Sequence, residues 1–152
     1  MAKQKSLVDI LEGHTTDIPA DKEALGRLLR LCPPSLPSDL DGTYYVKMLT
    51  GIIPDFSAFG HRKNFRHEGR AVVGENIFWE KTAWGSFRVV VRMWDEGSRT
   101  VIDYDTPQNT FSRRIRDTIV TVQKGRLYLG KFHLVICGKP RFIGFFTLTK
   151  KG

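Results

Sequence analysis

Two arginines in the C-terminal half have a spacing that suits the binding of an anion. Residues two apart on a β-strand point to the same side, so Arg114 and Arg116 would direct two guanidinium groups toward one point. Guanidinium groups bind carboxylates and phosphates through paired hydrogen bonds, which are strongest where water is excluded. If that point is a cavity, the pair predicts a site for an acidic ligand. The alternative is that both arginines are solvated or paired with Asp103, Asp105 or Asp117.

Two further polar residues lie in or beside the loop that precedes these arginines. Tyr104 shares a strand face with Ile102, which points its ring toward the protein interior. Asn109 lies farther along, and loops mounted on a rigid scaffold often carry binding residues. We expect both residues in a ligand pocket. The alternative for Tyr104 is an ordinary core position with a satisfied hydroxyl.

The histidines do not have the spacing of a metal site. His61 and His67 are six residues apart in the sequence. A strand of that length separates them by roughly 20 Å, so they cannot share an ion. No acidic residue lies at a spacing that would complete a set of ligands with them or with His133. We therefore expect neither a metal nor a cofactor, and we retain His61 as a candidate pocket residue.

Trp84 is the remaining candidate for contact with a ligand. Together with Trp79 and Trp94, it offers a flat ring that could stack on a planar molecule. Packing in a core or at the rim of a barrel is the alternative use of these side chains. An exposed Trp94 or Val90 on an otherwise polar strand face would suit a homodimer contact.

No combination of residues has the pattern of a catalytic centre. The sequence lacks a Ser-His-Asp signature, a glycine-rich phosphate loop before a helix and a paired cysteine nucleophile. Asp103 and Asp105 share a strand face, but they alternate with Ile102 and Tyr104, which favours the solvent side. We therefore expect a binding protein. An isomerase or hydrolase with Tyr104, His61 or an arginine in its pocket is an alternative.

Residues 1–40 have the character of a helical segment. Ser6 can cap a short helix that ends at Gly13, and Pro19 suits the first turn of a second helix. The prolines that follow Cys32 cannot continue a helix and predict an extended connector. An apolar face on the second helix is formed by Leu25, Leu28 and Leu29.

The remainder of the chain, residues 41–152, has the alternation of a β-sheet. About eight strands fit this pattern, at residues 43–49, 59–67, 70–80, 84–94, 99–105, 115–123, 126–136 and 141–149. Glycines at short intervals, at Gly69, Gly97, Gly125 and Gly138, suit hairpin turns. The sequence therefore predicts a mainly β protein with an antiparallel up-and-down β-barrel, whose closure removes the edge strands. An open sheet with one helical layer is the competing architecture.

The alternation also predicts which side chains fill the barrel. One strand would turn Phe87, Val89, Val91 and Met93 inward, and a later one Tyr128, Phe132, Leu134 and Ile136. Gly130 would mark a bend of the wall or a close approach of another backbone. Both faces of the last strand are apolar, so we expect the N-terminal helices to pack on the outside of the barrel or to plug one end.

The start of the first strand resembles that of the lipocalin-like, or calycin, barrels. Gly42-Thr43-Tyr44 stands where those proteins have Gly-x-Trp. The chain is also similar to uncharacterised bacterial proteins with an N-terminal helical segment, a Gly-x-Trp-x-Gly motif and such a barrel. Further similarity lies in the runs 104–109, 113–117 and 127–131. The resemblance implies a cavity for fatty acids, haem or other small apolar molecules, and it implies no reaction.

The balance of charges raises a second class of function. Lys and Arg outnumber Asp and Glu by 24 to 16, which gives a net charge of +8 and an isoelectric point near 9.7. Such a balance permits binding of nucleic acid or an anionic surface, and basic residues are dense between His61 and Arg70. The charges are otherwise scattered and no nucleic-acid-binding motif is present, so we do not expect nucleic acid as the partner.

Length and hydropathy favour one globular domain in the cytoplasm. A chain of 152 residues is enough for a sizeable core. No stretch resembles a signal peptide or approaches the roughly 18 apolar residues of a membrane span. Cys32 and Cys137 do not form the framework of a disulfide-rich protein. We expect a cytoplasmic protein that binds a small, apolar and acidic ligand in its barrel.

Overall fold

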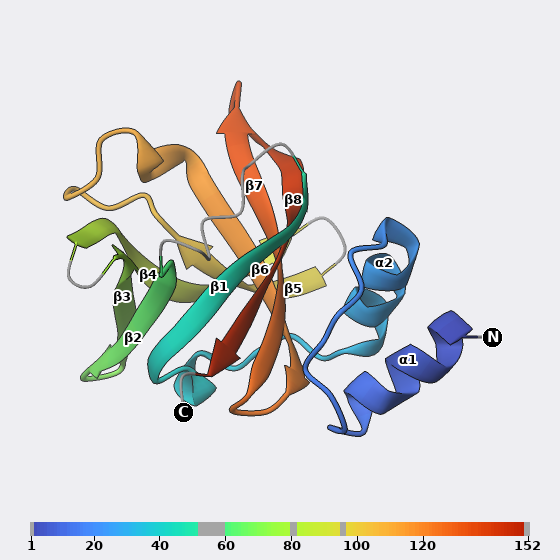
Figure 1. Ribbon diagram of the computed structural model, residues 1–152. Helices are drawn as coiled ribbons and strands as arrows, with labels where there is room; N and C mark the ends of the chain where they lie inside the picture. Colours follow the sequence, from blue (N-terminus) through green and yellow to red (C-terminus); the bar gives the residue numbers. More distant parts are fainter. Residues whose placement is uncertain (1, 52–59, 80–81, 95–96, 151–152) are drawn as a thin grey trace.

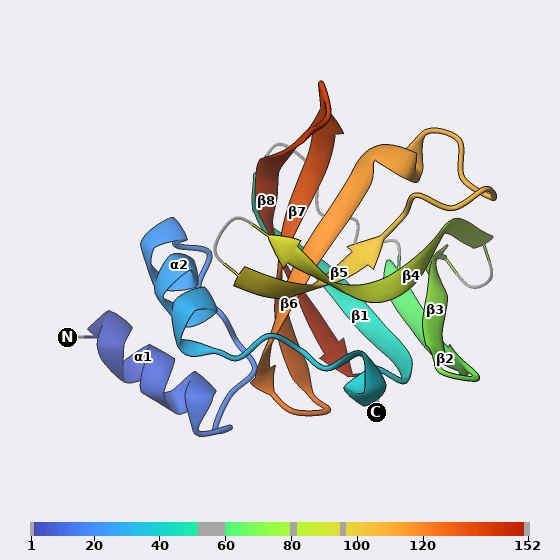
Figure 2. The ribbon, with the colours of Figure 1, turned by 180° about the vertical axis from the view of Figure 1, so that it is seen from behind.

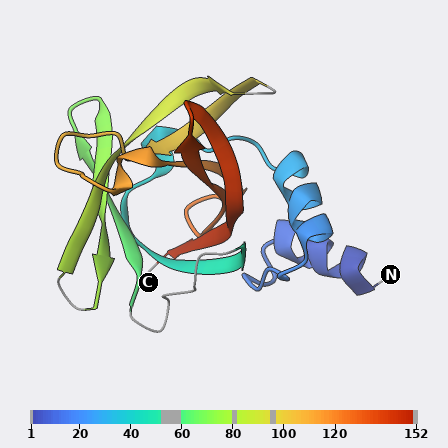
Figure 3. The ribbon, with the colours of Figure 1, turned by 90° about the horizontal axis from the view of Figure 1, so that it is seen from above.

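The computed structural model describes residues 2–51, 60–79, 82–94 and 97–150. These residues form a closed antiparallel barrel in which each strand pairs with the next, and β1 pairs with β8. Figure 1 shows the barrel with the two N-terminal helices beside it, and Figure 3 shows the strands as a ring. The predicted up-and-down barrel is confirmed, and the open sheet is excluded.

The strand boundaries lie close to those expected from the alternation. The eight strands are β1 (Gly42–Gly51), β2 (Arg62–Glu68), β3 (Ala71–Phe78), β4 (Thr82–Trp94), β5 (Gly97–Asp103), β6 (Ile115–Gln123), β7 (Leu127–Ile136) and β8 (Lys139–Lys150). Strand β5 ends two residues before the predicted limit, because the amide of Asp105 turns back to donate a hydrogen bond to Asp103 Oδ1 over 2.9 Å.

Glycines form the tight turns of the hairpins. Gly69, Gly125 and Gly138 all have positive φ angles, between 63° and 76°, which L side chains rarely adopt. The predicted turn glycine Gly97 also has a positive φ, and the residue before it, Glu96, lies outside the described residues. The glycines predicted from the sequence therefore supply the backbone conformation that these hairpin turns require.

The barrel interior holds a continuous core of aromatic and aliphatic side chains. Phe87, Val89 and Tyr128 point inward as predicted. Val91 and Met93 do not, because they are 59% and 77% exposed. At that point β4 has passed the end of β3 and pairs with β5 alone, as a ribbon that leaves the barrel (Figure 2).

The β7–β8 hairpin also runs past the end of the barrel. Ile136 is exposed, because the tip of this hairpin extends past the barrel.

Gly130 faces the ring of Phe146, and an added Cβ would lie 2.2 Å from that ring. The predicted approach of another backbone at Gly130 is therefore wrong, because the atoms that crowd this position belong to a side chain.

The N-terminal helices pack on the outer face of the barrel. They are α1 (Ala2–Leu11) and α2 (Lys22–Leu31), and their apolar faces contact Val120, Leu129 and Phe145. Helix α1 begins at Ala2, so Ser6 lies within it and is not its cap. Helix α2 begins after Asp21, whose carboxylate accepts a hydrogen bond from the amide of Glu23 over 3.1 Å.

The connector after α2 crosses strands β5 and β6 before entering β1. Pro34 pairs with Val120, and Ser35 accepts a hydrogen bond from the side chain of Thr100. After a short 3-10 turn, η1 (Pro37–Asp39), Leu40 is completely buried among the barrel core residues. None of the helices in the described part of the chain is long and apolar enough to span a membrane.

Candidate ligand site inside the barrel

The barrel interior contains a cavity of about 240 Å³. Most of its wall is apolar, because alternate residues of each strand turn toward the barrel axis. The apolar part of the wall is formed by Val46, Met48, Phe78, Ile115, Phe132 and Phe146. This volume is far larger than one water molecule needs, so the interior can hold a small organic molecule.

Polar side chains from four different segments reach this apolar cavity. Lys63 comes from β2, Asn76 from β3 and Asp117 from β6. Tyr104 follows directly after β5, and His61 precedes β2. These residues are far apart in the sequence, so only the closure of the barrel brings them together.

Lys63 is at the centre of the polar cluster. Its side chain is 3% exposed, and its Nζ donates hydrogen bonds to Asn76 Oδ1 over 2.8 Å and to the hydroxyl of Tyr104. The same Nζ lies 3.6 Å from Asp117 Oδ2. Burial lowers the pKa of Lys63, and the charge of Asp117 opposes that shift.

Asp117 is only partly satisfied by its surroundings. It is 1% exposed, and its Oδ1 makes no hydrogen bond to any residue that the structure describes. Burial raises its pKa from 3.8 to about 6, although the neighbouring Lys63 favours the charged form. A buried carboxylate oxygen without a donor is costly, which makes Oδ1 the natural anchor for a ligand that donates.

Tyr104 connects the lysine to the asparagine. Its hydroxyl accepts from Lys63 and, over 2.9 Å, from Asn76 Nδ2. Two accepted bonds occupy the oxygen lone pairs, so the hydroxyl proton is free for a further acceptor. Burial, followed by the negative charge of Asp117, raises the pKa of Tyr104 well above its usual value, and the phenol is neutral.

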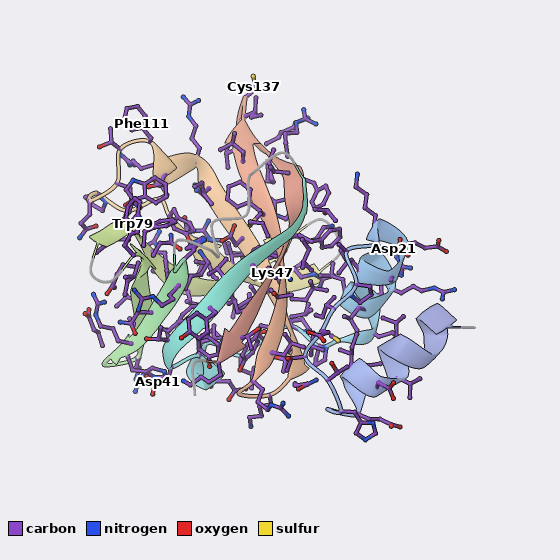
Figure 4. All side chains as sticks on the ribbon, viewed as in Figure 1. Asp21, Asp41, Lys47, Trp79, Phe111 and Cys137 are labelled. Atoms are coloured by element: carbon purple, nitrogen blue, oxygen red, sulfur yellow. The ribbon has the colours of Figure 1, made fainter. Side chains whose placement is uncertain are left out.

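Aromatic rings surround the polar cluster on the side of β3 and β4. His61 Nε2 lies 3.1 Å from Asn76 Oδ1, and its ring stacks on Phe78 at 4.4 Å. Phe78 also contacts Trp84, whose ring is half exposed. Figure 4 shows that the exposed rings of Trp79 and Phe111 project from this same side of the molecule.

A glycine in β4 makes room for the cluster. The register shifts between β3 and β4 beside Asn76, and Gly85 has a φ of +72° at this bulge. A Cβ at Gly85 would lie 3.2 Å from Asn76 Nδ2 and 3.4 Å from the ring of Tyr104. A larger residue would therefore be strained and would press on both polar side chains.

The structure brings together three of the residues singled out from the sequence. Tyr104, His61 and Trp84 all line the cavity. Asn109 instead fastens its loop to β4, because its side chain bonds both backbone groups of Ser86, over 2.9 and 2.5 Å, and the carbonyl of Tyr104 over 2.6 Å. Asn109 therefore holds the backbone of Tyr104 in place and is not part of the cavity wall.

The two arginines lie outside the cavity. Arg116 is on the outer face of β6, with its guanidinium 3.2 Å from Asp103 and 3.6 Å from Asp105. Arg114 is an exposed residue of the 3-10 turn η3 (Ser112–Arg114), so the two-residue alternation does not extend to it. The expectation that both face a pocket is wrong, and the alternative of pairing with Asp103 or Asp105 is confirmed for Arg116.

Sequence reasoning missed the charged centre of the site. Lys63 alternates with the buried Phe65, and Asp117 stands between Ile115 and Ile119, all of which face the core. The period of two was therefore a usable signal for both residues. It was overlooked because Lys and Asp are rarely buried, which makes a solvent position the default interpretation.

The other histidines and the basic segment have structural partners. His67 Nε2 lies 2.9 Å from the carbonyl of Leu40, and His133 is on the outer face of the barrel. Among the described residues, no group of His, Cys, Asp and Glu side chains could hold a metal ion. In the basic segment, Lys63 is buried and Arg66 pairs with Glu75 and Glu68. Arg70, in the turn after β2, is exposed.

Comparison with known proteins supports the fold alone. No protein-family model matches the sequence, and no curated protein does either. A solved structure described as a protein from Thermomonospora curvata has a similar fold, with a TM-score of 0.63 over the whole of both chains and 16% sequence identity. At that identity the likeness extends to the architecture and not to a ligand. The resemblance to lipocalin-like proteins stays a prediction.

Proposed function

We propose that the barrel binds one small, mostly apolar ligand that donates a hydrogen bond to Asp117. The observation that carries this proposal is the unpartnered Oδ1 of Asp117 in a cavity whose remaining wall is largely apolar. A ligand with a hydroxyl or N–H group would satisfy that oxygen and bury its apolar body in the same step. Lys63 would hold the carboxylate in its charged form.

The volume of the cavity limits the size of the ligand. A cavity of about 150 Å³ is known to accept benzene, with its six carbon atoms. In the same proportion of atoms to volume, the cavity of about 240 Å³ accepts about ten non-hydrogen atoms. A phenol, a monoterpene-sized alcohol or a small aromatic amine fits this limit. Haem and long-chain fatty acids exceed it.

The charges in the cavity favour a neutral ligand. Lys63 and Asp117 already form an ion pair, with 3.6 Å between Nζ and Oδ2. A carboxylate in the cavity would place a second negative charge near Asp117, in surroundings that screen charge poorly. The acidic head group expected from the sequence depended on Arg114 and Arg116. Because both arginines lie outside the cavity, we replace it with a neutral hydrogen-bond donor.

Three probes of similar size test this proposal. Benzyl alcohol, toluene and benzoate share one ring and differ only in the group that would meet Asp117. We expect benzyl alcohol to bind about tenfold more tightly than toluene, because one hydrogen bond to a charged group has about that value. Benzoate should bind most weakly. Protein-detected NMR titrations at pH 7 measure all three, and tighter binding of benzoate or toluene would overturn the proposal.

A blocked cavity provides the control for location. Ile115→Phe places a larger side chain on the cavity wall and should abolish the binding of benzyl alcohol. Val91→Phe makes a comparable change on the exposed part of β4 and should leave the affinity unchanged. Native mass spectrometry of the purified wild-type protein shows in addition whether a molecule of about 150 Da or less copurifies, as the volume limit requires.

The pKa of Asp117 favours a second candidate function, which is proton transfer to and from the bound ligand. A carboxylate with a pKa of about 6 is suited to act as a general base near neutral pH. Asp117 Oδ1 would take a proton from the carbon beside a carbonyl, and the C–H electrons would form the enolate. The free hydroxyl proton of Tyr104 would hydrogen-bond the enolate oxygen. The proton then returns to a carbon atom from Asp117.

Exchange of hydrogen for deuterium tests this second function without a known substrate. Cyclohexanone in D₂O gains deuterium beside its carbonyl whenever a base removes and returns a proton. We expect the protein to accelerate this exchange and Asp117→Asn to lose the acceleration. An exchange rate equal to that in buffer, with cyclohexanone bound in the cavity, would leave the protein as a binding protein only.

A further inference from the structure

We infer that a groove between helix α2 and the outside of the barrel binds a soluble organic anion with an apolar body. The groove has a volume of about 560 Å³. One side is formed by the end of α2 and the connector after it, and the other by β5, β6, β7 and β8. The barrel wall separates this groove from the interior cavity, so the inference does not depend on the proposed function.

Three cationic side chains from separate elements line the groove. They are Arg30 of α2, Arg99 of β5 and Lys131 of β7. No Asp or Glu is among the described residues that line it, and none of the three cations forms an ion pair with a described residue. Arg92 and Arg116, on the same outer surface, are both paired with Asp103. The uncompensated positive charge is thus concentrated at the groove.

The floor of the groove combines apolar side chains with two buried polar ones, Thr118 and His133. Val120 and Cys32 are buried there, and Phe142 stands at one side. Lys131 Nζ lies 5.2 Å from the centre of the Phe142 ring, which holds this cation beside an apolar surface. Burial raises the pKa of the Cys32 thiol to about 11, so it adds no negative charge. Cations beside the apolar side chains of Val120 and Phe142 fit a ligand with an anionic group on an apolar body.

The size and shape of the groove favour a discrete molecule. The scaling used for the interior cavity gives about twenty non-hydrogen atoms for 560 Å³. Several lining residues, including Cys32, Val120 and His133, are buried at its floor. A flat membrane surface would not reach such a floor, whereas a molecule with two or three rings and a sulfonate, carboxylate or phosphate would.

Two fluorescent probes with the same aromatic body test the inference. 8-Anilinonaphthalene-1-sulfonate carries an anionic group, and N-phenyl-1-naphthylamine lacks it. Both have more than the ten or so non-hydrogen atoms that the barrel cavity admits, so neither reports on the interior site. We expect the sulfonate to bind with one-to-one stoichiometry and at least tenfold more tightly than the neutral probe. Equal affinity of the two probes would overturn the inference.

Matched variants locate the binding. Lys131→Met and Arg99→Met remove one charge each and keep an unbranched apolar stem, and each should weaken binding of the sulfonate probe about tenfold. Arg70→Met removes the same charge from the exposed β2–β3 turn and should have no effect. Near-ultraviolet circular dichroism checks that each variant retains its packing. Unchanged affinity in folded Lys131→Met and Arg99→Met would contradict the inference.

Sedimentation with vesicles separates a soluble anion from a lipid surface. Vesicles of phosphatidylglycerol carry the same anionic chemistry on a flat bilayer. We expect no cosedimentation that depends on Lys131 at an ionic strength near 0.15 M, where charges are screened beyond about 8 Å. Cosedimentation that is lost in Lys131→Met, without binding of the sulfonate probe, would overturn the assignment of a soluble ligand.

Discussion

Two buried aspartates lie on opposite faces of the barrel wall, and the protein satisfies one of them far better than the other. Asp103 and Asp117 are on adjacent strands, in a register that pairs Asp103 with Arg116. They are 0% and 1% exposed. Guanidinium groups of Arg92 and Arg116 lie 2.5 and 3.2 Å from Asp103, and Arg88 is at 3.8 Å. Among the residues that the structure describes, Asp117 forms an ion pair with Lys63 alone, at 3.6 Å.

The difference between the two aspartates shows why burial alone does not identify a functional residue. Asp103 joins β4, β5 and β6 on the outer face. Its Oδ2 also lacks a hydrogen bond to a described residue, but the guanidinium groups beside it compensate its charge. Asp117 faces an apolar cavity with one oxygen that no described residue satisfies. A donor bound at Asp117 would satisfy this oxygen and recover part of the free energy that its burial costs.

The largest effect is expected from breaking the inner ion pair. Lys63→Met leaves Asp117 buried without a cation, which should lower the free energy of unfolding by roughly 3–5 kcal/mol. Denaturation by urea measures the change. The double variant Lys63→Met/Asp117→Leu removes both charges and should recover most of the loss, since the site is otherwise apolar. A loss of stability that the second substitution does not restore would mean that Lys63 acts through packing.

A smaller effect is expected from the loop behind the cavity. Asn109→Ala removes three hydrogen bonds that hold Tyr104 and β4 together. At about 0.5–1.5 kcal/mol for each bond, with partial replacement by water, we expect a loss of about 1–3 kcal/mol. Because Asn109 does not contact the cavity, saturating benzyl alcohol should still stabilise the variant. Complete loss of binding in a folded Asn109→Ala protein would show that the residue contacts the ligand.

The outer cluster should tolerate the loss of one arginine. Arg92→Met leaves Arg116 and Arg88 beside Asp103, and the side chain of Arg92 is partly exposed. We therefore expect a change of about 1 kcal/mol or less, in contrast to Lys63→Met. Thermal and urea unfolding of the two variants side by side gives the comparison. Equal losses would remove the distinction drawn between the two faces.

The contribution of an aspartate to the free energy of unfolding should also change with pH in opposite directions on the two faces. The pKa of Asp117 is raised from 3.8 to about 6, so the folded state binds more protons than the unfolded state between these values. This group therefore makes the free energy of unfolding fall as pH rises from about 4 to about 6. The difference in unfolding free energy, Asp117→Asn minus wild type, should grow with pH over that window.

Asp105 on the outer face provides the opposite case. A hydrogen bond from Arg113 lowers the pKa of Asp105 below 3.8, so its contribution is present above that value and lost as pH falls below it. The difference for Asp105→Asn minus wild type should therefore be negative above about pH 4 and rise toward zero as pH falls below it, where the wild type loses this contribution. Parallel slopes for the two variants would show that the two faces do not differ in this way.

The architecture was predictable because local signals repeat along the chain. Alternation set the strands, glycines set the turns, and the leucine face of residues 22–31 required an apolar surface outside the barrel. Predictions failed where an element ended. Val91 and Met93 continue the apolar face of β4 after its pairing with β3 has stopped. Arg114 precedes β6, so its side follows from a 3-10 turn.

The candidate site was predictable only in part, because it is assembled from long-range contacts. Tyr104 was identified from its neighbour Ile102 on the same strand face, which is local information. The pairing of Lys63 with Asp117 joins β2 to β6 across the barrel, and strand alternation gives the face of each residue but not its partner. The partner depends on barrel closure and on register shifts such as the bulge beside Asn76.

The most direct test of a ligand site inside the barrel is the position of bound benzyl alcohol. Intermolecular nuclear Overhauser effects report which methyl groups lie near its ring. We predict contacts to the methyl groups of Ile115, Met48 and Val46, which line the cavity. Contacts to Leu29 and Val120 of the outer groove, or none to the cavity residues when the ligand is bound, would contradict the account.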